Sequence, residues 1–360
     1  MSRKKTLKFL ISCALSIFFL YLAFRNVAFK QLITVFKQIN YWWTIPFVII
    51  TVLGMYIRAI RWRWILKSRY NYPSYHLFPS LMIGFALNSL LPLRAGEFAR
   101  PFVLSRREKI PYSTVFATVV VERIVDGLTL LICFLIVFLF VKIDPKAELP
   151  FGKYVITGEM LTSLTKKLSM ITFILLVGVI TIIVDKTRRI YELCIERIPL
   201  LSQGIKEKLI HILEHFSHGF HSLKNFKYVL MIMLYSLVIW ALVGFSLQVM
   251  SWGFNDLSLN FFHGMAVTII ICIAIMIPAA PGYWGLYECG GIFALMALGL
   301  ISQEKGQATA LSFSLVIHTL QIVPIVIIGI FYMWKENISL KQIEDLSADQ
   351  EPSLETRDLP

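Results

Sequence analysis

The stretch YSTVFATVVVERIVDGLTLLICFLIVFLFV, from Tyr112 to Val141, is long and apolar but carries three charges in its first half. At the rise of an α-helix it measures about 45 Å, and about 20 apolar residues suffice to cross a bilayer core. It therefore predicts a membrane-spanning helix. Its charged residues, Glu122, Arg123 and Asp126, start about 15 Å from its first residue, which places them near the middle of a bilayer.

The composition of the whole chain agrees with this prediction. Of its 360 residues, 57% are hydrophobic and 16% are charged, and the mean hydropathy is +0.70, whereas soluble domains carry roughly 25% charged residues. We therefore expect an all-α polytopic membrane protein. Six runs are predicted to be full spans, namely Leu7 to Phe24, Tyr41 to Ile60, Tyr112 to Val141, Leu168 to Val184, Tyr228 to Met250 and Ala308 to Trp334.

Two further apolar stretches, Leu77 to Leu93 and Phe261 to Ala280, lead into polar segments broken by proline and glycine. Unpaired backbone groups are not tolerated facing lipid, so such breaks occur where protein or a water-filled cavity surrounds them. We expect both stretches to be re-entrant or broken helical hairpins, which gives six to eight transmembrane helices in all. The residues predicted to make the breaks are Pro92, Gly96, Pro278, Pro281, Gly282 and Gly285.

The distribution of positive charge predicts the topology. Lys and Arg are concentrated in residues 185–227, whereas the loop from Ser251 to Asn260 has neither, so residues 185–227 should be a cytoplasmic loop. Both termini are then cytoplasmic, in a protein of the cytoplasmic (inner) membrane, and residues 41–141 and 228–334 form halves of opposite orientation. Inverted repeats with interrupted helices are typical of transporters; the alternative is chance similarity between two turns rich in proline and glycine.

The remaining features limit the class of function. Residues 1–335 are expected to form one membrane domain, and residues 336–360 a disordered polar tail. The chain has a net charge of +13, and its Lys and Arg residues lie in short clusters beside apolar runs. This placement favours contact with lipids over contact with nucleic acid. The five cysteines lack the spacing of a metal site, and histidines at 211, 215 and 218 have helical spacing that also suits an interfacial helix, so neither a metal nor another cofactor is expected.

The charged residues within the predicted membrane region are the candidate site. Charges at this depth are costly and mark functional sites unless they pair with one another. A purely structural ion cluster is the alternative for Glu122, Arg123 and Asp126, and positive-inside anchoring is the alternative for the arginines near the cytoplasmic face. The candidates for binding a lipid headgroup are Arg58, Asn88, Arg94, Glu97, Arg100, Glu122, Arg123, Asp126 and Glu288; no catalytic residue is assigned.

Four segments together resemble the lysylphosphatidylglycerol synthase transmembrane family, also described as flippase-like. They are RAIRWRW (Arg58 to Trp64), NSLLPLRAGEFAR (Asn88 to Arg100), VERIVD (Val121 to Asp126) and PGYWGLYE (Pro281 to Glu288). The resemblance covers roughly Leu7 to Trp334. It implies the lipid-translocating membrane domain of bifunctional relatives without their soluble aminoacyl-transferase domain. Stand-alone relatives are associated with polyprenyl-linked sugars, glycolipids or hopanoids, so the resemblance leaves the lipid open.

These observations predict a lipid translocase, and not an enzyme, that moves a lipid with an anionic or phosphate-bearing headgroup. The expected partners are membrane lipids (phospholipid, glycolipid or polyprenyl-phosphate-linked), a synthase or glycosyltransferase, and further copies of the chain. Two alternatives stay open. One is a membrane-embedded glycosyl or lipid-headgroup transferase, and the other is a non-catalytic scaffold of an envelope-lipid synthesis complex.

Overall fold

A computed structural model describes residues 3–25, 27–67, 70–91, 95–141, 148–151, 154–157, 226–276, 281–301 and 306–338, with scattered positions from 159 to 204. The helices are α1 (Arg3–Phe24), α2 (Phe29–Gln38), η1 (Tyr41–Trp43), α3 (Thr44–Leu66), α4 (Ser74–Leu90), α5 (Gly96–Glu108), α6 (Tyr112–Phe140), α10 (Phe226–Ser251), α11 (Phe261–Ala274), η3 (Pro281–Tyr283), α12 (Leu286–Ala297) and α13 (Gln307–Lys335). The predicted all-α membrane architecture is confirmed.

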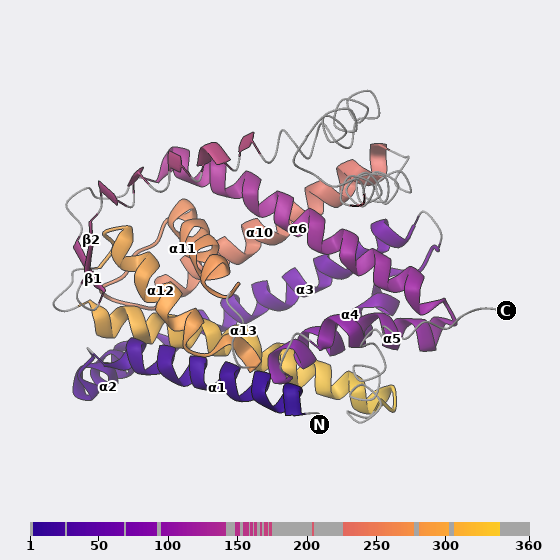
Figure 1. Cartoon of the computed structure of the whole chain (residues 1–360), viewed down its shortest axis with the longest axis horizontal. Helices are drawn as coiled ribbons and strands as arrows, with labels where there is room; N and C mark the ends of the chain where they lie inside the picture. The colour runs from indigo at the N-terminus through magenta and orange to yellow at the C-terminus, as the bar shows by residue number, and fades with distance from the viewer. Residues whose placement is uncertain are drawn as a thin grey trace.

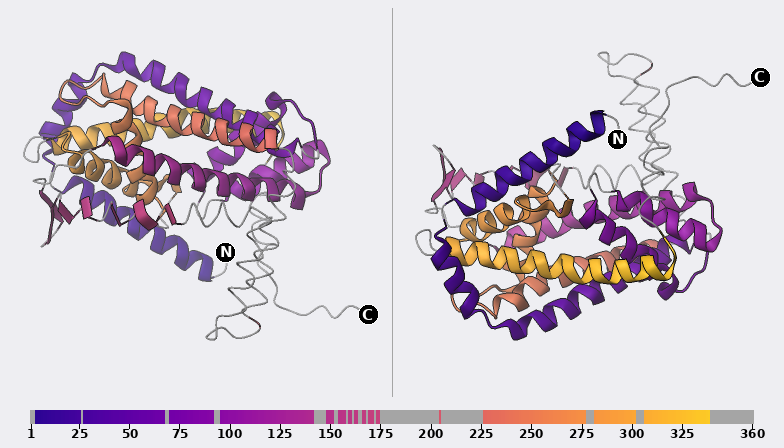
Figure 2. Two further views of the ribbon diagram at one scale, coloured as in Figure 1. Left: turned by 90° about the horizontal axis from the view of Figure 1, so that it is seen from above. Right: turned by 90° about the horizontal axis from the view of Figure 1, so that it is seen from below.

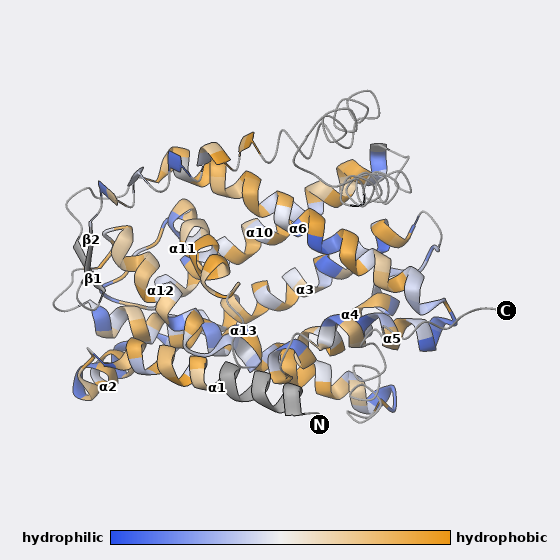
Figure 3. Cartoon of the chain, viewed as in Figure 1, coloured by the Kyte–Doolittle hydropathy of each residue, from blue (hydrophilic) through white to orange (hydrophobic). Residues whose placement is uncertain are grey.

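Three segments of the described chain are long and apolar enough to cross a membrane: Tyr41–Leu66, Lys227–Ser251 and Gln307–Lys335. A fourth span results if the bent pair Ala14–Phe24 and Phe29–Gln38 counts as one. Helix α6, with 29 residues, is as long as α13 but carries the three charges described above. Figure 3 shows that the helices are largely apolar, with polar segments within α3 and α6.

The central pair of helices is α3 and α10, which pack antiparallel along most of their length. Near one end, the rings of Trp64 and Tyr228 lie 5.5 Å apart. Near the other end, the rings of Trp43 and Trp252 lie 5.0 Å apart. Helices α6 and α13 flank this pair, and the axes of the long helices are roughly aligned along the long dimension of the molecule (Figures 1 and 2).

Helices α4 and α5 form an antiparallel hairpin whose two outer ends lie together. His76 Nδ1, near the start of α4, is 3.4 Å from Glu108 Oε1 at the end of α5. Nearer the break the two helices touch through backbone, because a Cβ added at Gly96 would lie 1.9 Å from the carbonyl oxygen of Gly84. Only a residue without a side chain permits this approach.

Helices α11 and α12 form a second hairpin, at the opposite end of the molecule (Figure 1). A Cβ at Gly290 would lie 2.9 Å from the Ala274 side chain, so these helices are also in close contact beside their break. The breaks of the two hairpins meet within the molecule: a Cβ at Gly282 would lie 3.3 Å from the carbonyl oxygen of Ser89. The chain thus turns back twice in the interior, from opposite ends.

The order of helix, hairpin and helix occurs twice, as α3, α4–α5, α6 and as α10, α11–α12, α13. The contacts correspond between the halves. Helix α4 of the first half contacts α13, the last helix of the second half, and α11 of the second half contacts α6, the last helix of the first. Within the halves, α3 contacts α4 and α10 contacts α11. An inverted repeat requires the first helices of its halves, α3 and α10, to be antiparallel. The predicted relation between residues 41–141 and 228–334 is compatible with this arrangement, and their orientation in a membrane stays a prediction.

Peripheral elements complete the described chain. Helix α1 packs on α12, and α2 packs on α13 through the buried Leu32. Strands β1 (Glu148–Phe151) and β2 (Tyr154–Thr157) pair antiparallel, which the sequence had not indicated. The predicted span Leu168 to Val184 is described only at scattered positions, and of the predicted cytoplasmic loop 185–227 only Gly204, Phe226 and Lys227 are described. The histidines of this loop and nearly all of the tail lie outside the described residues.

Candidate functional site

Charged residues from α3, α5 and α6 form one cluster, with Arg61 at its centre. The Arg61 guanidinium lies 3.2 Å from Glu122 Oε1, donates to both oxygens of Asp126 and donates to Ser236 Oγ at 2.8 Å. Arg61 and Glu122 are completely buried, and Asp126 is 6% exposed. A buried charge is tolerated when it is paired and hydrogen-bonded, and Arg61 meets this condition through two acids on α6 and a hydroxyl on α10.

Arg100 ties the first hairpin to the same acids. Its two terminal nitrogens donate to the two oxygens of Glu122 at 2.9 and 2.8 Å, the two-pronged geometry that suits arginine and carboxylate. Its guanidinium carbon also lies 3.7 Å from the centre of the Trp62 ring. The side chain is therefore held between α3 and α6, and it is 2% exposed.

The other charged members of the cluster are less tightly held. Arg123 approaches Glu97, Glu122 and Asp126 at 3.7 Å each, and its side chain is 36% exposed. Arg58 approaches Asp126 only at 3.8 Å. Among the described residues of this cluster, four arginines (58, 61, 100 and 123) face three carboxylates (97, 122 and 126), so 4 − 3 leaves one excess positive charge.

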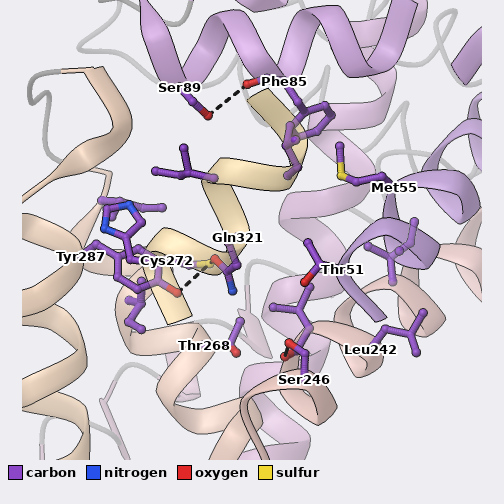
Figure 4. A pocket seen from close by; sticks show the side chains of 18 of the residues that line it. Thr51, Met55, Phe85, Ser89, Leu242, Ser246, Thr268, Cys272, Tyr287 and Gln321 are labelled. Carbon is purple, nitrogen blue, oxygen red and sulfur yellow. Dashed lines mark hydrogen bonds between the residues drawn. The ribbon is translucent and has the colours of Figure 1, made fainter. Parts of the chain in front are cut away.

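A cavity of about 290 Å³ lies between the hairpin breaks and helices α3, α10 and α13. Figure 4 shows residues from these elements pointing toward it. Its walls are mostly apolar, and Arg58 is the charged residue among those that line it. The other polar lining residues are Thr51, Ser89, Trp240, Ser246, Thr268, Tyr283, Tyr287, His318 and Gln321.

On the side of the second hairpin, a buried acid and a histidine join α12 to α13. Glu288 Oε2 accepts a hydrogen bond from the Gly285 N–H at 2.6 Å, which caps the first turn of α12. Its other oxygen lies 2.7 Å from His318 Nδ1. The His318 ring stacks on Tyr287 with centres 4.0 Å apart, so the cavity wall at this point is rigidly packed.

The structure separates the candidates proposed from the sequence. Arg58 lines the cavity, whereas Arg100, Glu122 and Asp126 are buried in ion pairs beside it. Arg123 and Glu97 are at the partly exposed edge of that cluster. Asn88 packs against Gly96 inside the first hairpin. Glu288 does not line the cavity itself, and it pairs with His318, which does.

Several of the predicted break residues are described. Gly96 is the contact point of the first hairpin, and Gly282 and Gly285 have positive φ angles of 73° and 91°, a conformation that favours glycine. Pro281 opens the short helix η3. Arg94, Pro92 and Pro278 lie outside the described residues, so the role predicted for Arg94 stays a prediction.

Sequence reasoning missed three residues of the site. Arg61 belongs to the segment RAIRWRW, whose arginines beside Trp62 and Trp64 fit positive-inside anchoring, and it is not among the candidates named from the sequence. His318 and Gln321 are isolated polar residues within the long apolar run of α13. Their spacing of three residues, which places both on one helix face, was the available signal.

Comparison with known proteins gives the same class of molecule. The model of the lysylphosphatidylglycerol synthase TM region matches residues 9–329. A UPF0104 membrane protein of Pyrococcus horikoshii is 25% identical over 74% of this chain and 81% of its own length. A UPF0104 membrane protein of Methanocaldococcus jannaschii is 30% identical over 35% of the chain and 38% of its own length.

A third relative is the glycosyltransferase AglD of Haloferax volcanii, 36% identical over 23% of this chain and 13% of its own length. The chain thus spans well under half of this relative and of the Methanocaldococcus protein. No solved structure matches. The helices and the match over residues 9–329 define a multi-pass membrane protein. The chain belongs to the family of the lysylphosphatidylglycerol synthase transmembrane region.

Proposed function

We propose that this protein is a translocase that moves a lipid with a phosphate-bearing headgroup across the membrane. The observation that carries the proposal is the cavity between the two hairpin breaks, in which one arginine faces mostly apolar walls. Ligand sites of this kind use apolar surface for affinity and a few polar groups for orientation. The headgroup binds at Arg58 while the acyl chains stay in the bilayer.

Arg58 is suited to this role because its positive charge is only partly neutralised by neighbouring acids. Its acid contact within the described residues is the 3.8 Å approach to Asp126, and its guanidinium is near the rings of Phe85 and Trp240 at 5.6 and 5.9 Å. A planar guanidinium matches the oxygens of a phosphate. The excess positive charge of the cluster favours an anion in the cavity over a cation.

The family name and the relative named as a glycosyltransferase support a role in lipid metabolism at the membrane. They leave open whether the partner is a synthase or a glycosyltransferase. In our proposal the chain carries the lipid and does no chemistry on it. Among the described residues that line its cavity, Arg58 is the charged group, and we assign the chain no catalytic residue or cofactor.

Translocation in proteoliposomes tests this proposal. Fluorescent phosphatidylglycerol in both leaflets is quenched from outside, and the rate at which the inner pool becomes accessible is measured. Arg58→Ala should slow it by about 10- to 100-fold, because a hydrogen bond to a charged group contributes roughly 1.5–3 kcal/mol. Arg63→Ala is the matched control, since Arg63 lies on the same helix but does not line the cavity.

Equal rates in wild type and Arg58→Ala, with both proteins folded, would contradict the proposal. Turnover of a labelled lipid-linked sugar donor by the purified protein would instead support the transferase. The scaffold alternative would be supported if the translocation rate were unchanged by Arg58→Ala and if only substitutions in residues 185–227 impaired the synthesis of envelope lipids.

A further inference from the structure

The cavity has a chemical selectivity that can be derived from its walls. This inference rests on the proposed function, because it takes the ligand to be a lipid headgroup. We infer that the site selects phosphate headgroups that carry free hydroxyl groups and rejects headgroups that carry an ammonium, with Gln321 and Tyr287 as the residues that determine this specificity.

The first part of the argument is the lack of a place for an ammonium. A cation out of water needs a carboxylate or a free aromatic face. Among the described residues that line the cavity there is no Asp or Glu, and the nearby acids are engaged by arginines or by His318.

Three of the aromatic rings that line the cavity, those of Phe85, Trp240 and Tyr287, already contact a cation or a stacked ring. Arg58 lies over Phe85 and Trp240, and His318 is stacked on Tyr287 with an interplanar angle of 7°. A cationic ligand that used one of these three rings would have to displace the contact that the ring already makes. It would also be repelled by Arg58, whose charge faces the same 290 Å³ space.

The second part of the argument is the supply of neutral hydrogen-bonding groups. The hydroxyls of Thr51, Ser89, Ser246 and Thr268 each donate to a carbonyl of their own helix, so toward the cavity their oxygens can only accept. Neutral acceptors pair well with ligand hydroxyls, whereas an ammonium buried among them would keep an uncompensated charge.

Gln321 supplies the complementary donors. Its Oε1 accepts the Tyr287 hydroxyl at 3.1 Å (Figure 4), which fixes the orientation of the amide. The amide nitrogen, with two hydrogens to donate, forms no hydrogen bond to the described residues. A ligand hydroxyl both donates and accepts, so it can use Gln321 and a neighbouring threonine or serine at once. Glycerol, cyclitol and sugar headgroups share this chemistry.

Native mass spectrometry of the full chain, purified in detergent, tests the selectivity. The protein is mixed with equal amounts of phosphatidylglycerol, phosphatidylinositol, phosphatidic acid and phosphatidylethanolamine of matched acyl chains. Wild type should retain phosphatidylglycerol or phosphatidylinositol about tenfold more than the other two, because one well-formed hydrogen bond is lost with each of those. The preferred one of the pair distinguishes glycerol from ring hydroxyls.

Two substitutions test the assignment to Gln321. Gln321→Leu should lower retention of the hydroxylated lipids to that of phosphatidic acid, and Gln321→Glu should shift retention toward phosphatidylethanolamine by supplying the missing carboxylate. Ile325→Leu, a volume-conserving change in the same wall, is the control.

Equal retention of phosphatidylethanolamine and phosphatidylglycerol by wild type would overturn the inference, as would an unchanged preference in Gln321→Leu. If Gln321→Glu fails to fold, Gln321→Leu and Tyr287→Phe carry the test. Selective retention without translocation would remove the transport role but leave the site, whereas translocation without selectivity would overturn this inference alone.

Discussion

Arg58 and Arg61 lie nearly one turn apart on α3, but their charges are used differently. Arg61 is completely buried and has Glu122, Asp126 and Ser236 as partners. Arg58 faces the cavity and contacts Asp126 only at 3.8 Å. Arg61 therefore holds helices together, and Arg58 remains available to a ligand.

Removing an acid from the buried cluster should destabilise the protein. Glu122→Gln leaves Arg61 and Arg100 without their shared carboxylate, and breaking a buried ion pair from one side costs about 3–5 kcal/mol. We expect a clearly lower midpoint of thermal unfolding in detergent. Glu97→Gln is the matched control, because Glu97 makes one 3.7 Å contact at the partly exposed edge and exposed pairs contribute about 0–1 kcal/mol. Equal midpoints for the two variants would show that the cluster is not structural.

His318 should matter for stability through Glu288. Replacing it with leucine leaves one oxygen of a fully buried carboxylate without its 2.7 Å partner, at a cost of about 1–3 kcal/mol. His318→Asn keeps a donor and should cost less. Thermal unfolding of both variants measures the difference, and a smaller loss for leucine than for asparagine would contradict the role of the hydrogen bond.

At the scale of the elements, the two hairpins depend on residues without side chains where their helices meet. Gly96→Ala would place a Cβ 1.9 Å from the Gly84 carbonyl oxygen, which the hairpin can accommodate only by opening. We expect a loss of about 1–3 kcal/mol from this overpacking.

The matched control is Gly127→Ala on α6, where an added Cβ meets nothing within 4 Å. This change should be neutral or stabilise by up to about 1 kcal/mol, since alanine favours helix over glycine. Thermal unfolding of the two variants gives the comparison. A Gly96→Ala variant as stable as Gly127→Ala would mean that α4 and α5 do not pack through Gly96.

The positions of the helices were largely predictable, because hydrophobic runs and prolines set them. The run Tyr112 to Val141 became α6, which ends one residue earlier, and Ala308 to Trp334 became α13, extended by one residue at each end. The run Tyr41 to Ile60 was predicted too short, since α3 continues to Leu66. Arg61 can lie within this helix because it pairs with acids on α6, and hydropathy along the chain does not reveal such pairing.

The candidate site was less predictable, for the same physical reason. Hydropathy marks a charge as costly but does not say whether another helix neutralises it. Glu122 and Arg58 were both candidates in the sequence, and only the packing of α3, α5 and α6 separates a buried pair from a cavity residue. Gln321 gave almost no signal, since one neutral amide changes the hydropathy of α13 very little.

At the scale of the whole molecule, two hairpins that enter from opposite ends and meet in the interior bring polar groups to the middle of an apolar body. Outer residues of the first hairpin should then lie on one side of the membrane. In a background without native cysteines, Tyr75→Cys and Arg106→Cys should be labelled by an impermeant maleimide from the same side, and Asp256→Cys from the other. Labelling of positions 75 and 106 from opposite sides would mean that α4 and α5 cross the membrane.

The most direct test of the central claim is an experimental structure of the chain in nanodiscs that contain phosphatidylglycerol. Our account predicts a headgroup phosphate within hydrogen-bonding distance of the Arg58 guanidinium, with the glycerol hydroxyls beside Gln321 and the acyl chains directed toward the bilayer. A cavity filled by an acyl chain, with the phosphate bound elsewhere, would contradict the account.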